Sequence, residues 1–120
     1  MSGPLLIIED NVQNYYMMRF LLEKSGFKVV VADNGRDGIT AALECNPQAI
    51  LLDIQLPEMD GYAVAAELKK HQQLSAVPII AVTSYAMPGD RERILAAGAT
   101  GYIEKPINPD TFIAELGSYL

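Results

Sequence analysis

The stretch AILLDIQLPEMDGY, residues 49–62, joins an apolar run to an acidic turn. Ala49 to Leu52 carry no polar side chain, which is typical of a parallel strand covered by helices on both faces. Asp53 follows directly, and Pro57 and Gly61 mark a turn before the next helix. The stretch therefore predicts a buried strand that presents a carboxylate at its carboxyl end.

Four more short apolar runs occur along the chain, and helical patterns lie between them. The other predicted strands are Leu5 to Ile8, Phe27 to Ala32, Pro78 to Val82 and Gly101 to Ile103. The predicted helices run from Asp10 or Asn11 to Leu22, from Asn34 to before Asn46, from Gly61 to about Lys70, from Pro88 to before Gly98, and from Asn108-Pro109 onward. Five strands alternating with five helices predict a doubly wound α/β fold with a parallel sheet, as one domain over residues 1–120.

Composition narrows the range of partners. The chain has 120 residues, a net charge of −6 and a pI near 4.6, so nucleic acid and anionic membrane are poor partners. Cys45 is the only cysteine, which excludes an internal disulfide and fits a reducing cytosol. No apolar run approaches the roughly 18 residues of a membrane span. We expect a cytoplasmic domain.

Polar side chains follow four of the predicted strands. They are Glu9-Asp10, Asp53, Thr83 and Lys105, and in a parallel sheet they meet at one rim, where such folds bind ligands. Three carboxylates together repel one another unless a cation intervenes. Oxygen ligands without histidine or cysteine select a hard ion, and a site with few protein ligands suits Mg²⁺ better than Ca²⁺.

The same residues suit phosphoryl transfer. A carboxylate beside Mg²⁺ can attack a phosphoryl group and form an acyl phosphate. Such transfer depends on positioning and charge neutralisation, which Mg²⁺ and the Lys105 ammonium could supply. The Thr83 hydroxyl could donate a hydrogen bond to the phosphoryl group.

The ordered set of motifs resembles a response-regulator receiver domain, from about Leu5 to Leu120. It consists of Glu9-Asp10, the segment DIQLPEMDG at Asp53, VTS at Thr83 and EKPI at Lys105. The start EDNVQN and the run SYAMPGDRERILAAGATGYIEKPI resemble stand-alone receivers and receivers of hybrid histidine kinases. The resemblance implies a flavodoxin-like fold with strand order 2-1-3-4-5.

The resemblance also implies the roles of the rim residues. Asp53 would accept a phosphoryl group from a histidine kinase or a histidine phosphotransfer protein. Glu9, Asp10, Asp53 and the backbone carbonyl of Gln55 would bind Mg²⁺, while Thr83 and Lys105 would contact the phosphoryl group. It further implies a cis peptide bond at Lys105-Pro106.

The same resemblance implies a conformational switch and residues that control the lifetime of the acyl phosphate. Thr83 and Tyr102 match a paired switch that repacks the face formed by the helix from Pro88, the strand Gly101 to Ile103 and the last helix. That face would bind an unknown output partner, and the chain would be a monomer or a phosphorylation-dependent dimer. Gln55 and Tyr85 lie where receivers control the access of water, and a bulky Tyr85 predicts slow self-dephosphorylation.

Three other functions fit these residues less well. Haloacid-dehalogenase-type phosphatases need a second aspartate where this chain has Gln55, and a flavin binder needs a glycine- and hydroxyl-rich loop where it has EDNVQN. A degenerate receiver that only docks proteins would lack an acidic residue, the acceptor or the lysine. We therefore expect a domain that phosphorylates and dephosphorylates itself, not an enzyme with a separate substrate.

Overall fold

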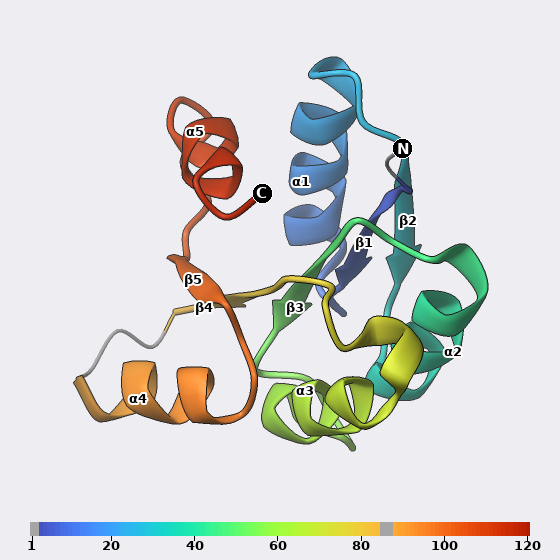
Figure 1. Cartoon of the computed structure of the whole chain (residues 1–120). Helices are drawn as coiled ribbons and strands as arrows, with labels where there is room; N and C mark the ends of the chain where they lie inside the picture. Colours follow the sequence, from blue (N-terminus) through green and yellow to red (C-terminus); the bar gives the residue numbers. More distant parts are fainter. Residues whose placement is uncertain (1–2, 85–87) are drawn as a thin grey trace.

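The computed structural model describes residues 3–84 and 88–120, and it shows one parallel sheet covered on both faces (Figure 1). The strand order is β2-β1-β3-β4-β5, as predicted. The strands are β1 (Leu5–Ile8), β2 (Val29–Ala32), β3 (Ala49–Asp53), β4 (Ile79–Thr83) and β5 (Gly101–Glu104). All four strand pairs are parallel, so every carboxyl end lies at the same edge of the sheet.

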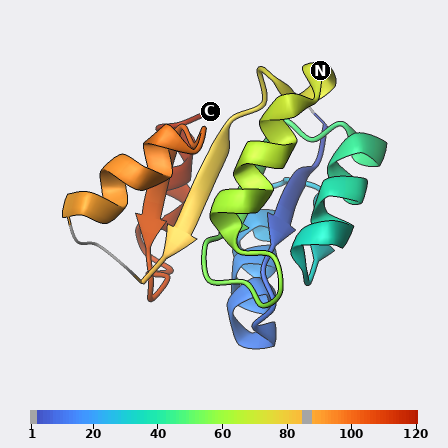
Figure 2. The same cartoon turned by 90° about the horizontal axis from the view of Figure 1, so that it is seen from below.

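Helices cover the sheet in two layers, as the turned view shows (Figure 2). The helices are α1 (Val12–Lys24), α2 (Gly35–Cys45), α3 (Gly61–Lys70), α4 (Pro88–Ala96) and α5 (Phe112–Gly117), with a short 3₁₀ helix at Gln72–Leu74. Side chains from α1 and α5 pack with Leu5 and Ile7 on one face, whereas α2 and α3 pack with Leu6 and Ile8 on the other. The doubly wound prediction is confirmed.

The buried strands explain the apolar runs. Every residue of β1, β3 and β4 is buried, because helices cover both faces of these three central strands. The edge strand β2 is only half-buried along most of its length. Since β3 and β4 extend one residue further than predicted, Asp53 and Thr83 belong to the strands and share their burial.

Three predicted helix starts are confirmed by their capping bonds. The side chains of Asn11, Asn34 and Asp60 each accept a hydrogen bond from the backbone N–H three residues further on. The predicted start at Asn108-Pro109 is wrong, because α5 begins at Phe112. Residues 108–111 form a turn in which Asn108 Oδ1 accepts from the backbone N–H of Asp110 at 2.9 Å.

No helix within residues 3–84 and 88–120 is long and apolar enough to cross a membrane.

Candidate functional site

Three buried polar residues lie at adjacent strand ends. Glu9 follows β1, whose last residue pairs with Leu52, and Asp53 pairs with Val82 of β4. Thr83 then ends β4. Glu9 and Thr83 have no exposed surface and Asp53 retains 2%, so the sheet holds two carboxylates and a hydroxyl out of water. Burial of this kind requires charge pairing or a bound cation.

Lys105 supplies a positive charge to both buried carboxylates. Its Nζ lies 3.0 Å from Glu9 Oε1 and 3.2 Å from Asp53 Oδ1. The peptide bond to Pro106 is cis, as predicted, and the backbone N–H of Lys105 donates to the Thr83 carbonyl at 2.8 Å. The end of β5 is thereby tied to the end of β4, which directs the lysine toward β1 and β3.

Backbone N–H groups fix the orientation of the carboxylates. The N–H of Asn11 donates to Glu9 Oε2 at 3.1 Å, and the N–H of Gln55 donates to Asp53 Oδ1 at 3.0 Å. Both donors lie two residues beyond the acid that they bind. The chain therefore turns at the end of β1 and of β3 in the same way, and each turn holds one carboxylate.

The electrostatics of the cluster disfavour the ionised form of Glu9. Burial and the neighbouring Asp53 raise the pKa of Glu9 from 4.5 to about 7, against the opposing effect of Lys105. Burial lowers the pKa of Lys105, but the two carboxylates outweigh burial and raise it overall. The ammonium thus stays charged, and it does not fully compensate two buried acids.

The acidic cluster can hold a metal ion. Glu9, Asp10 and Asp53 each offer one oxygen, and these three atoms lie within 4.8 Å of one another. The buried Glu9 Oε1 has no hydrogen-bond partner in the described chain beyond its ion pair with Lys105. Asp10 is exposed, so the cluster is open on one side. Three oxygen ligands with an open side fit a hard divalent cation.

Gln55 makes a contact that the sequence did not reveal. Its Oε1 accepts a hydrogen bond from Ser84 Oγ at 2.8 Å, although the two residues are 29 positions apart. Only the register of β3 and β4 brings them together, so no local pattern could have found the pair. Tyr85, the other residue predicted to control water access, lies outside the described residues.

Tyr102 lies away from the carboxylates, on the α4 side of the sheet. Its ring is half-buried against a small cluster formed by Ile54, Ala81 and Ile94. The Arg91 guanidinium lies 5.9 Å from the ring centroid, and the Tyr102 carbonyl accepts a long hydrogen bond, 3.3 Å, from the Tyr119 hydroxyl. The ring therefore has weaker attachments than the buried residues of the rim.

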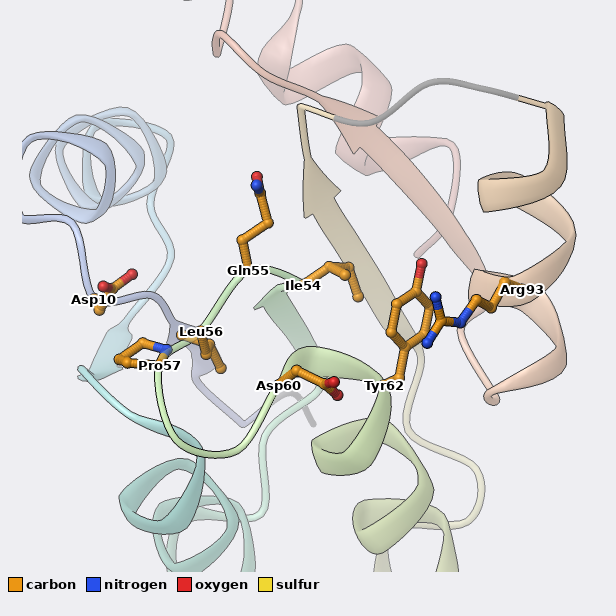
Figure 3. Close-up of a pocket in the computed structure, with 8 residues that line it drawn as sticks. All are labelled: Asp10, Ile54, Gln55, Leu56, Pro57, Asp60, Tyr62 and Arg93. Carbon is orange, nitrogen blue, oxygen red and sulfur yellow. The ribbon is translucent and has the colours of Figure 1, made fainter.

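A groove of about 500 Å³ opens beside the acidic cluster. Figure 3 shows Asp10 and Pro57 on one side of it and Tyr62 with Arg93 on the other. The Arg93 guanidinium lies 4.0 Å from the Tyr62 ring centroid, which joins α4 to α3. The groove thus runs from Asp10 of the acidic cluster to the contact between these two helices.

The strand order, with buried acids and a lysine at the carboxyl ends, is the arrangement that the motifs led us to expect of a signalling domain of the receiver class. A family model described as the response regulator receiver domain matches residues 5–117. The chain belongs to this family, so the resemblance drawn from the motifs is confirmed.

Individual relatives agree in length and fold. The polar-differentiation response regulator DivK of Brucella anthropi is 43% identical, over 100% of this chain and 98% of its own. The chemotaxis protein CheY4 of Vibrio cholerae superposes with a TM-score of 0.95 at 27% identity, covering both chains fully. A third relative is the receiver domain of the sensor histidine kinase PA1611 from Pseudomonas aeruginosa PAO1, whose structure has a magnesium ion coordinated in the active site cleft. It superposes with a TM-score of 0.88 at 32% identity, over 99% of this chain and 98% of that one.

Proposed function

We propose that Asp53 accepts a phosphoryl group from a phosphohistidine of a histidine kinase or a phosphotransfer protein. The reaction would take place in the cytoplasm. The observation that carries this proposal is the position of Asp53, which is buried at the end of β3 with the Lys105 ammonium 3.2 Å from Oδ1. A carboxylate oxygen of Asp53 bonds to phosphorus while the phosphorus–nitrogen bond of the donor breaks, and the bonding electrons leave with the imidazole. Lys105 lies close enough to pair with the phosphoryl oxygens.

Mg²⁺ is the metal that we propose for the acidic cluster. Glu9, Asp10, Asp53 and the backbone carbonyl of Gln55 would hold it, since oxygen ligands and an open side favour this ion. When bound, Mg²⁺ neutralises charge on the phosphoryl oxygens. The likeness to a receiver domain with magnesium in its cleft supports this assignment.

Thr83 and Tyr102 form the switch in this proposal. The Thr83 hydroxyl would hydrogen-bond the phosphoryl group, and Tyr102 would turn inward on the α4 side of the sheet. The half-buried position of the ring supports a residue with two orientations. The face formed by α4, β5 and α5 would then bind an output partner or a second copy of the chain.

The domain is proposed to act on itself rather than to turn over a separate substrate. Water would attack the acyl phosphate, the bond from phosphorus to the Asp53 oxygen would break, and inorganic phosphate would leave. Gln55 and Tyr85 would control the access of that water, and Tyr85→Ala is expected to shorten the lifetime of the acyl phosphate. A lifetime that stays unchanged in this variant would remove Tyr85 from the proposal.

Intact mass after incubation with acetyl phosphate tests the proposal. The parent chain should gain a single phosphoryl group in the presence of Mg²⁺ and none after chelation, and Asp53→Ala should gain none. Asp33→Ala is a matched control, because Asp33 is an exposed aspartate that follows β2, at the same edge of the sheet but two strands away from Asp53. No adduct on the folded parent chain would instead favour a domain that only docks other proteins.

A further inference from the structure

One hydrogen bond spans the rim between the ends of β3 and β4. Ser84 Oγ donates to Gln55 Oε1 at 2.8 Å. Ser84 directly follows Thr83, and Gln55 lies two residues beyond Asp53. Since Asp53 pairs with Val82 in the sheet, this bond crosses just beyond the two buried residues that end these strands. Gln55 and Ser84 are both exposed, so they form part of the solvent side of the site.

The Gln55 side chain is fixed at both of its ends. Its backbone N–H donates to Asp53 Oδ1 at 3.0 Å, and its side-chain oxygen is bound by Ser84. Figure 3 shows this side chain pointing away from Asp60, which lies across the groove that both residues line. The position of the amide is therefore set relative to the carboxylate by two contacts, one local and one through Ser84.

We propose that Ser84 is a positioning residue that holds the Gln55 amide over the solvent side of Asp53 and thereby slows hydrolysis of the acyl phosphate. This inference rests on the proposed phosphorylation of Asp53. In hydrolysis, a water oxygen bonds to phosphorus as the bond from phosphorus to Asp53 breaks. The electron pair returns to the carboxylate, and the water proton leaves with phosphate or solvent. An amide fixed beside the acceptor restricts the approach of that water.

The geometry favours shielding over assistance. A glutamine assists an attacking water chiefly by accepting a hydrogen bond from it through the amide oxygen. Here Oε1 already accepts from Ser84, which reduces its capacity to orient a water. Loss of the serine hydroxyl frees the amide to rotate away and leaves Oε1 open to water. Both changes speed hydrolysis.

The test is the first-order decay of the phosphoryl adduct after acetyl phosphate is removed, at constant Mg²⁺. Ser84→Ala should shorten the adduct lifetime by about two- to tenfold, the change in rate that one protein hydrogen bond supports. Gln55→Ala should shorten it to a similar extent, and the double variant should decay no faster than Gln55→Ala alone. This lack of additivity is the signature of one residue acting through the other.

Two control variants separate positioning from a general effect on structure. Ser84→Thr keeps a hydroxyl and should keep the parent lifetime. Ser75→Ala removes a hydroxyl that bonds the Gln72 carbonyl, in the segment before β4 begins, and should also leave the lifetime unchanged. An unchanged or longer lifetime in Ser84→Ala, or additive effects in the double variant, would overturn the inference. Absence of any adduct on the parent chain would overturn the phosphorylation of Asp53 itself.

Discussion

Two neighbouring parts of the rim are built in different ways. The acidic half, formed by residues 9–11 and 53–61, holds its side chains through backbone bonds and buried ion pairs. Gly61 approaches the Asp53–Ile54 backbone so closely that its N–H donates to the Ile54 carbonyl at 2.9 Å. Its α3 helix then buries Val64, Ala65 and Leu68.

The α4 half, formed by Thr83, Ser84 and α4, has a helix that is mostly exposed. Among the side chains of α4 that the structure describes, only Ile94 is buried, and Leu95 is exposed. Its described contacts include the packing of Ile94 against Ile54, the Ser84–Gln55 hydrogen bond, and the contact of Arg93 with Tyr62 of α3. A fixed acceptor beside a lightly attached helix suits a domain in which chemistry at one half changes the packing of the other.

The largest expected effect concerns the charge of Glu9 in the acidic half. The native state holds the Glu9 proton up to about pH 7, whereas its ordinary pKa is 4.5. The native state thus binds more protons between these values, and stability falls as the pH rises through this window. In metal-free protein at pH 8, Glu9→Gln should be more stable than the parent chain by up to about 3 kcal/mol, from the size of the pKa shift.

Urea unfolding with a chelator present, from pH 4 to pH 8, measures this effect. The difference between Glu9→Gln and the parent chain should shrink toward low pH, where Glu9 is protonated in both states. A difference that does not change with pH would mean that Glu9 is ionised in the fold, and that the acidic half is better compensated than its geometry indicates.

The next effect compares one glycine from each half. A Cβ at Gly61 would lie 2.6 Å from the Asp53 carbonyl oxygen and would also contact the Ile54 Cα, and neither backbone group can move freely. We expect Gly61→Ala to lower the free energy of unfolding by about 2 kcal/mol, as overpacking commonly does. Gly89→Ala in α4 meets nothing within 4 Å, so its stability should be unchanged or rise by up to about 1 kcal/mol.

Thermal unfolding of the two alanine variants and the parent chain gives the comparison. Equal destabilisation of Gly61→Ala and Gly89→Ala would show that the two halves are equally packed. The adduct assay adds a second measure, since only Gly61→Ala should disturb the orientation of Asp53.

Most of the fold could be predicted because its signals are local. The runs Leu5 to Ile8 and Ala49 to Leu52 are apolar on both faces, and the capping residues Asn11, Asn34 and Asp60 stand where they were expected. The start of α5 was misplaced because Asn108 bonds its own downstream backbone, which competes with the helix. Local propensity does not determine which of these two uses prevails.

The sequence indicated which residues come together at the sheet edge, but not the contacts that they make there. Parallel topology was enough to bring Glu9, Asp53 and Thr83 to one edge of the sheet. The complete burial of Glu9, and with it the high pKa, depends on how closely the helices cover β1. The hydrogen bond from Ser84 to Gln55 depends on the register of two strands. No pattern within a single segment carries that information.

The smallest expected effect concerns the attachment of α4 itself. Arg93 is exposed and lies 4.0 Å from the Tyr62 ring centroid, a contact that contributes about 0.5–1 kcal/mol at such sites. Arg93→Ala should lower stability by that amount, and a double-mutant cycle with Tyr62→Leu should recover most of it as coupling. Arg91→Ala is the matched control, since Arg91 lies 5.9 Å from the Tyr102 ring centroid and its loss should lower stability less. In Arg93→Ala, hydrogen exchange should rise in α4 and stay unchanged in α3. An equal rise in both helices would mean that α4 is no more weakly attached than α3.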